Sequence, residues 1–173
     1  IERGAKIIAR GTKTAPIVFT SNQPAGARAY GDWGGVIICG SAPTNWTAGQ
    51  AQVEGGPRSF YGGTNPNDNS GTLQYVRIEF PGVAFSPGNE VNGLTLCGVG
   101  AATTINNIQV SFCGDDSYEW FGGNVNAKYL VAYRGWDDDF DTDCGYSGKN
   151  QFVFGLRDPY AADQSGSKAF END

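Results

Sequence analysis

The sequence contains no histidine and no methionine, and it has no long apolar run. Without histidine the chain lacks the commonest general base and the commonest ligand of transition metals. No run of 18 apolar residues is present, so we expect no membrane-spanning helix in this segment. The four cysteines, Cys39, Cys97, Cys113 and Cys144, have no CxxC spacing, which excludes zinc-ribbon and thioredoxin-like sites.

Turn-forming residues, by contrast, are abundant. The 173 residues include 26 glycines and eight prolines, and the hydrophobic fraction is 39%. This composition is typical of many short strands joined by turns. The length fits one domain over residues 1–173. Because the chain starts at "IERGAKI" without Met and stops at "AFEND", we expect it to be a piece of a longer protein.

Charge is distributed unevenly along the chain. Residues 1–80 hold seven Lys or Arg against five Asp or Glu, a net of +2, whereas residues 81–173 hold five against thirteen, a net of −8. Nucleic acid is excluded as a partner because the acidic half offers little to neutralise phosphates. This charge distribution favours cations as binding partners, or a ligand that binds through bound cations.

The sequence repeats itself with a period of about 22 residues. The segments 106–127, 128–149 and 150–171 align one under another, and strand-like copies also occur at 73–80 and 92–98. The columns expected to face inward are Ile108–Leu130–Phe152, Val110–Ala132–Phe154 and Tyr118–Phe140–Ala162. A constant period with short strands predicts an all-β parallel solenoid whose coils stack into one core. A β-sandwich would also contain short strands, but it would not give columns at constant spacing.

Two stretches resemble a known family. "GTKTAPIVFTSNQPAGARAYGDWGG" is similar to the opening of right-handed parallel β-helix repeat proteins. "GDDSYEWFGGNVNAKYLVAYRGWDDDFDTDCGYSGKNQFVFGLRDP" resembles a group of bacterial secreted or outer-membrane-associated β-helix proteins, many from Bacteroidetes-like and marine bacteria. The resemblance implies a right-handed parallel β-helix of about 22 residues per coil and an exported protein. It implies no particular reaction, and members of the group usually extend beyond both ends of this chain.

The most unusual stretch is "GWDDDFDTDCGYSG" at 135–148, which carries five aspartates. Alternate side chains of a strand share a face, so Asp139, Asp141 and Asp143 are expected to point outward together. The period also stacks Glu119, Asp141 and Asp163 in one acidic column, Asp115 on Asp137, and Asp116 on Asp138. The predicted metal ligands are therefore Asp115, Asp116, Glu119, Asp137, Asp138, Asp139, Asp141, Asp143 and Asp163.

Carboxylates held in register repel one another by roughly a kcal/mol or more per pair at an intermediate dielectric. A bound cation, retained protons or pairing with arginine would relieve this repulsion. Ligands that are all oxygen select Ca²⁺ or Mg²⁺, and a loosely shaped set of many carboxylates suits Ca²⁺ better. Two alternatives stay open: the aspartates cap backbone amides in the turns, or a pair of them is catalytic.

Aromatic and basic residues flank these acids. Phe121 and Tyr133 are expected to face outward and, with Trp136 and Arg134, to form a sugar-binding surface. In the alternative interpretation Trp120 and Trp136 fill corners of the coil. Arg134 falls in the column of Phe112 and Leu156, so it is expected either to be buried against a carboxylate or to lie along the surface.

The cysteines give one structural expectation. Cys39 and Cys97 occupy the same slot in "IICG" and "LTLCG". Neighbouring coils would bring them within disulfide range, so we expect at most one bridge, Cys39–Cys97. Otherwise the cysteines serve as small buried apolar residues.

Two functions are consistent with these features. The first is a secreted or cell-surface module, stabilised by Ca²⁺, that binds polysaccharide or surface proteins in an extracellular assembly. The second is a Ca²⁺-dependent polysaccharide lyase, with Lys128, Lys149 or Arg134 as base. A glycoside hydrolase using Asp116 with Asp138, or Glu119 with Asp141, is a variant of this second function. The absence of histidine and of a distinctive basic motif favours the binding module.

Overall fold

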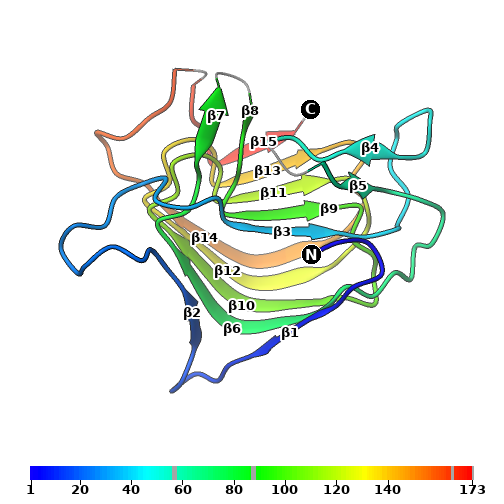
Figure 1. The fold of residues 1–173 in the computed structure, drawn as a ribbon, viewed down its shortest axis with the longest axis horizontal. Coiled ribbons are helices and arrows are strands. Elements are labelled where there is room, and N and C mark those ends of the chain that lie inside the picture. Colours follow the sequence, from blue (N-terminus) through cyan, green and yellow to red (C-terminus); the bar gives the residue numbers. More distant parts are fainter. Residues whose placement is uncertain (56–57, 87–88, 165, 173) are drawn as a thin grey trace.

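The structure is a computed structural model that describes residues 1–55, 58–86, 89–164 and 166–172. Two parallel sheets dominate it, and we name them the bent sheet and the straight sheet (Figure 1). The bent sheet contains β1 (Ile7–Arg10), β2 (Ile17–Phe19), β6 (Gly71–Glu79), β10 (Thr104–Ser111), β12 (Ala127–Tyr133) and β14 (Asn150–Leu156). The straight sheet contains β3 (Val36–Cys39), β9 (Leu94–Cys97), β11 (Tyr118–Phe121), β13 (Phe140–Asp143) and β15 (Phe170–Asn172).

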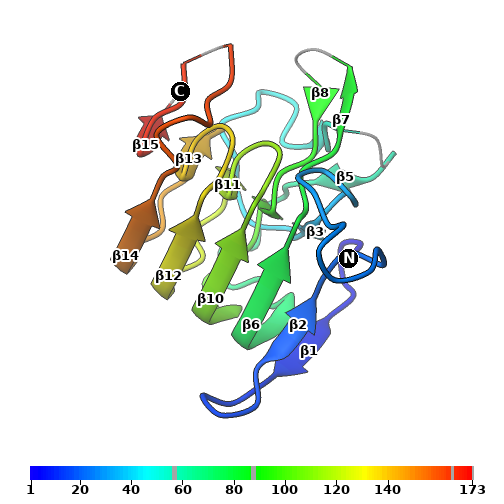
Figure 2. The same ribbon diagram turned by 90° about the vertical axis from the view of Figure 1, so that its left-hand side faces the viewer.

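The chain alternates between the two sheets, and every strand pair within them is parallel. Successive coils therefore stack along one axis, as Figure 2 shows for β6, β10, β12 and β14. The described residues contain no helix. The predicted all-β parallel β-helix is confirmed.

Each long strand of the bent sheet turns a corner at a single residue. The buried side chains of Leu73 and Val76 are three positions apart, not two, because Tyr75 between them has a φ of 49°. One residue in the left-handed region redirects the strand while the side chains on both sides of the corner still face the core. The same position is occupied in the following coils by Asn107, Tyr129 and Phe152, with φ between 55° and 61°.

The 22-residue register is correct for the central coils and wrong for the last one. Ile108 pairs with Leu130, and Tyr118 pairs with Phe140, as predicted. Leu130, however, pairs with Val153, and Phe140 pairs with Phe170. The residues expected in these columns lie elsewhere: Phe152 and Phe154 are each 57% exposed, and Ala162 lies in a turn.

Turn length explains this error. The turn between β11 and β12 spans 122–126, whereas the turn between β13 and β14 spans 144–149 and is one residue longer. The turn before β13 spans 134–139, whereas the turn before β15 spans 157–169. Backbone pairing between strands sets which residues are neighbours. A constant sequence period therefore predicts these neighbours only while successive turns have the same length.

The main core lies between the two sheets. Its largest fully buried side chain is Trp120, which stacks on Tyr118 with ring centroids 6.0 Å apart and contacts Tyr146 at 5.5 Å. Trp120 therefore fills the core, whereas Trp136 is 39% exposed. Burial of these rings and of the stacked aliphatic columns supplies the main stabilisation of the coil.

A second, smaller core covers the outer face of the straight sheet. The hairpin of β4 (Ala51–Gln52) and β5 (Phe60–Tyr61) lies over it, and the hairpin of β7 (Ala84–Ser86) and β8 (Asn89–Glu90) rises at the other end (Figure 1). The Phe121 ring packs at 6.1 Å from the Tyr61 ring and is only 6% exposed. The prediction that Phe121 faces outward from the coil is correct, but the hairpin buries it, so it cannot contact a ligand as expected.

The cysteines lie in these cores. Cys39 and Cys97 are direct neighbours in register between β3 and β9, as predicted. All four cysteines are buried free thiols, so no bridge joins this pair. They act as small apolar residues in the two cores.

Candidate metal centre

An acidic cluster lies where the turns before β11 and β13 enter the straight sheet. Three buried carboxylates, those of Asp116, Glu119 and Asp141, bring oxygens within 4.8 Å of one another. Asp115, Asp116 and Asp137 form a second group with the same spacing, and these outer aspartates are half-buried. Asp116 belongs to both groups, so the cluster runs from the covered face of the sheet toward the surface.

The straight sheet holds the inner group in place. Glu119 on β11 pairs in register with Asp141 on β13 and with Thr95 on β9, so the three side chains share the outer face. The side-chain amide of Asn92 donates a hydrogen bond to Glu119. Asp116 is held by the backbone amide of Asp138, which donates to its Oδ1 at 2.8 Å.

Burial and mutual repulsion raise the pKa values of these carboxyl groups. Burial, and then the charge of Asp115, raise the pKa of Asp116 to about 9. Burial, and then the charge of Asp116, raise the pKa of Glu119 well above its ordinary value. Burial raises the pKa of Asp115 to about 8, with further contributions from Glu90 and Asp137. At neutral pH the cluster must hold protons or a cation, because its full negative charge is not stable by itself.

The donor set fits a hard divalent cation. The candidate ligand atoms are carboxylate oxygens, and the neighbouring Thr95, a residue that is only 2% exposed, adds a hydroxyl. Thr95 Oγ1 has no hydrogen-bond partner among the residues that the structure describes. An unpaired buried hydroxyl beside crowded carboxylates fits a Ca²⁺ or Mg²⁺ site, since both ions take oxygen ligands.

The structure places the other predicted metal ligands outside the inner group. Asp138 is buried and accepts a hydrogen bond from the backbone amide of Lys168, so it caps a turn. Asp139 is 1% exposed and pairs with Arg157 at 3.2 Å; it does not share an outward face with Asp141 and Asp143. The Asp143 side chain accepts from the backbone amide of Cys144.

The predicted stacking of Asp163 on Asp141 is wrong. The acidic column continues from Asp141 to Glu171 on β15, because the long turn 157–169 shifts the register. Asp163 lies in that turn, where its backbone amide donates to Ser167. Its charge still acts on Asp115, so it contributes to the acidic field without joining the column.

The predicted sugar-binding residues divide between two places. Tyr133, Arg134 and Trp136 gather near Tyr30 and Phe112, which the sequence did not indicate. The Trp136 ring lies 5.5 Å from Tyr30, and the Tyr133 ring lies 5.4 Å from Phe112, both edge to face. Phe121, as described, is instead under the β4–β5 hairpin.

Arg134 lies along the surface. Its guanidinium lies 5.6 Å from the centre of the Tyr133 ring and pairs with Asp158 at 3.6 Å, not with the turns at 115–116 or 137–138. Its backbone amide donates to the carbonyl of Leu156. Because Tyr133 pairs in register with Leu156, the residue beside Arg134 in the next coil is Arg157, not Leu156. The arginine that pairs with a buried carboxylate is Arg157, whose partner is Asp139.

The lysines proposed as catalytic bases lie on another surface. Lys128 and Lys149 line a depression of about 490 Å³ together with Asn126, Asn150 and Gln151. Among the residues that the structure describes, no acidic residue lines this depression. These lysines therefore do not complete a catalytic arrangement with the acidic cluster.

Two acidic residues near the cluster could not be predicted from the repeat in the sequence. Glu54 and Glu90 come from the segments that carry the two hairpins, and their charges raise the pKa of Asp115. Hairpin segments do not follow the 22-residue repeat, so spacing could not locate them. Thr95 could have been found by aligning "NGLTLCG" with "DSYEWFG", because both copies occupy the straight sheet.

Comparison with known families agrees with this architecture. A family model described as a pectate-lyase like beta helix domain matches residues 1–173. The chain belongs to this family. Neither the curated proteins nor the solved structures contain a match to this pectate-lyase-like chain. Within the described part of the chain, no helix has the length and apolarity needed to cross a membrane.

Proposed function

We propose that this pectate-lyase-like β-helix is an extracellular or cell-surface module that binds Ca²⁺ and, through it, an anionic polysaccharide. The observation that carries the proposal is the inner group of Asp116, Glu119 and Asp141, whose oxygens lie within 4.8 Å of one another although each residue is at most 9% exposed. Buried carboxylates this close need either protons or a counter-charge.

Three cationic side chains near the cluster pair with other acids. Arg157 pairs with Asp139, and Arg134 pairs with Asp158. Lys168 pairs with Glu171 at the far end of the acidic column. These ion pairs make the three side chains less available as the counter-charge of the inner group, which supports a metal ion in that role.

The outer group supports a role in ligand binding. Asp115 and Asp137 are half-buried and continue the cluster toward the surface, near the exposed ring of Trp136. A cation held by the inner acids would supply positive charge to a uronate carboxylate at this edge. The aromatic group around Trp136 would then pack against a sugar ring.

Catalysis is the second candidate. Glu119 and Asp141 are adjacent in register, at the separation of about 4.8 Å between strands that a retaining hydrolase can use. However, Asp116 and Asp138 both accept hydrogen bonds from backbone amides, and Lys128 and Lys149 line a separate surface. These contacts favour the binding module over a lyase or a hydrolase.

Calorimetry and thermal melting test the metal site. We expect Ca²⁺ at a hundredfold excess over its Kd to stabilise the EDTA-treated protein by about 2.7 kcal/mol. For a chain of this size that is a rise in Tm of roughly 5–10 °C. Asp141→Asn should abolish most of this rise, whereas Asp158→Asn, which changes an acid outside the cluster, should retain it. An unchanged Tm together with no heat of Ca²⁺ binding would refute the site.

Binding to polygalacturonate, measured with and without Ca²⁺, tests the polysaccharide part. We expect binding that requires Ca²⁺ and is lost in Asp141→Asn. Formation of unsaturated uronate products, followed by absorbance, would establish the lyase instead. Ca²⁺ binding without any effect on polygalacturonate binding would reduce the site to a structural one.

A further inference from the structure

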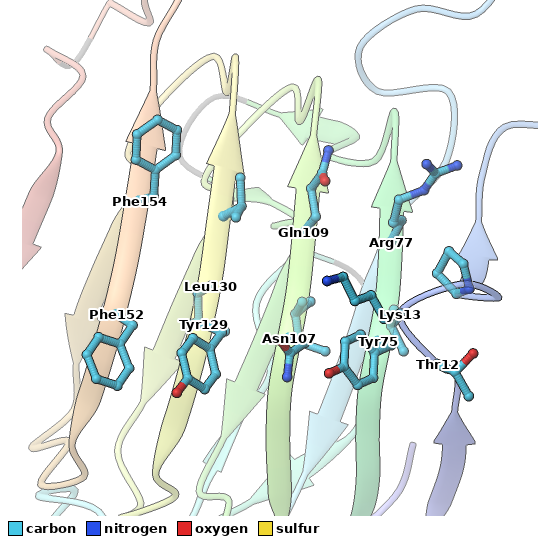
Figure 3. Close-up of a pocket in the computed structure, with 14 residues that line it drawn as sticks. Thr12, Lys13, Tyr75, Arg77, Asn107, Gln109, Tyr129, Leu130, Phe152 and Phe154 are labelled. Atoms are coloured by element: carbon cyan, nitrogen blue, oxygen red, sulfur yellow. The ribbon is translucent and has the colours of Figure 1, made fainter.

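A groove of about 450 Å³ crosses the outer surface of the bent sheet (Figure 3). It lies over β6, β10, β12 and β14 and contains none of the acidic residues described above. Its aromatic lining includes Tyr129, Phe152 and Phe154, whose exposed fractions are 49%, 57% and 57%. Large exposed rings that gather along a groove indicate a binding surface.

Two rows of side chains form the walls of the groove. Figure 3 shows Phe152, Tyr129, Asn107 and Tyr75 side by side at the corners of the strands. The second row, two residues further along each strand, is Phe154, Val131, Gln109 and Arg77, which pair in register across β14, β12, β10 and β6. The groove therefore runs along the axis of the β-helix and crosses one strand per coil.

The backbone accounts for the placement of the first row. Tyr75, Tyr129 and Phe152 have φ values of 49°, 58° and 61°, a region that bulky residues rarely adopt. Each is the extra residue that turns its strand, so its side chain points away from the core. Aromatic side chains at three such corners give a row of rings that rigid strands hold in place.

We propose that this groove binds an extended glycan of equatorially linked pyranoses lying along the axis of the β-helix. Such a glycan is a flat ribbon with apolar faces and hydroxyls at its edges, which matches aromatic rings beside amide side chains. The rings of Tyr129 and Phe152 are 4.9 Å apart and 13° from parallel. The coils repeat at about 4.8 Å, close to the length of one sugar in such a ribbon, so successive sugars meet successive coils.

The polar lining fits the edges of this ligand. Asn107 interrupts the aromatic row between Tyr75 and Tyr129, and Gln109 lies in the second row on the same strand. Their amides can hydrogen-bond sugar hydroxyls. Lys13 and Arg77 stand at the β6 end of the groove, where the loop carrying Lys13 closes it (Figure 3).

The groove is separate from the proposed metal centre. It lies on the bent sheet, whereas the acidic cluster lies on the outer face of the straight sheet and in the turns before it. The glycan site therefore does not depend on Ca²⁺. Failure of one proposal leaves the other standing, and the two are distinguished by their response to EDTA.

Titration calorimetry with cellohexaose tests the groove, with maltohexaose as the linkage control. We expect cellohexaose to bind equally in Ca²⁺ and in EDTA, and maltohexaose to bind at least about tenfold more weakly. Tyr129→Ala and Phe152→Ala should each weaken cellohexaose binding by about tenfold, because each removes a stacking ring. Both residues are exposed, so the circular dichroism spectrum and Tm should change little.

Two controls make the result decisive. Tyr160→Ala removes a ring that is 96% exposed and outside the groove, and Asp141→Asn alters the metal centre; neither should change cellohexaose binding. Absence of cellohexaose binding by the unaltered protein would overturn the proposal. It would equally be overturned if binding persisted in Tyr129→Ala and Phe152→Ala. Sedimentation that showed a dimer dissociated by Tyr129→Ala, without cellohexaose binding, would assign the groove to a second copy of the chain instead.

Discussion

The Oδ1 atom of Asp116 accepts a hydrogen bond from the backbone amide of Asp138 at 2.8 Å, across one coil and 22 residues of sequence. The same carboxyl group belongs to both groups of the acidic cluster. The capping contact and the proposed metal site, which the sequence offered as alternatives, therefore share one side chain. The bond fixes the position of Asp116, while the crowding of Glu119 and Asp141 creates the need for a proton or a counter-charge.

The first prediction concerns pH. Asp116 has an ordinary pKa of 3.8 and a folded pKa of about 9, so between these values the folded state holds a proton that the unfolded state has lost. The free energy of unfolding of the metal-free protein should therefore fall as pH rises from about 5 toward 9, by at most about 1.4 kcal/mol per pH unit for one such group. Urea unfolding at several pH values in EDTA measures the slope.

Ca²⁺ and an isosteric variant supply the controls for this pH dependence. Saturating Ca²⁺ should flatten the slope, since a bound cation stabilises the ionised carboxylates. Asp116→Asn should also reduce the slope in EDTA because it removes one titrating group. A metal-free protein that becomes more stable as pH rises from 5 to 8 would contradict the raised pKa of this cluster.

The second prediction concerns the pair of Asp139 and Arg157. The Asp139 side chain is 1% exposed, and Arg157 Nη1 lies 3.2 Å from its Oδ1. Arg157→Ala should destabilise the protein by roughly 3–5 kcal/mol, since it leaves a buried carboxylate without its cation. Thermal and urea unfolding measure the loss.

A double variant provides the matched control for that pair. Arg157→Ala combined with Asp139→Asn removes both charges, so it should cost less than Arg157→Ala alone. Arg134→Ala, which breaks the more exposed pair with Asp158, should cost about 1 kcal/mol or less. Equal losses for Arg157→Ala and Arg134→Ala would show that Asp139 does not depend on Arg157.

The third prediction concerns the contact between β1 and β6 of the bent sheet. Gly71 has a φ of 115°, and a Cβ at this position would lie 2.0 Å from the backbone oxygen of Ile7. Gly71→Ala should therefore displace β1 from β6 and lower the Tm by several degrees, about 2–4 °C for each kcal/mol lost. Differential scanning calorimetry measures the change.

Gly4 separates this clash from backbone strain. Gly4 also has a positive φ, 83°, but a Cβ there would have no atom within 4 Å. Gly4→Ala should cost only about 1–2 kcal/mol from the backbone conformation. If both variants had the same Tm, close approach of β1 would not be the reason for glycine at position 71.

The sequence predicted the central coils correctly because their turns are equal in length. Ile108 and Leu130, and likewise Tyr118 and Phe140, are neighbours at the predicted spacing. The stacking of Glu119 on Asp141 follows from the same repeat. The acidic cluster was therefore largely visible in the sequence, although Asp138 and Asp139 have other partners.

The tertiary structure alone decided two further matters. Turn length set the register of the last coil, which replaced Asp163 by Glu171 and turned Phe152 out to the surface. The hairpins decided which outward side chains are covered, so Phe121 is buried while Trp136 is exposed. The period and the inward face of a strand are local properties that the sequence determines. The covering of the outward face depends on long loops that carry no repeat, and only packing fixes where they lie.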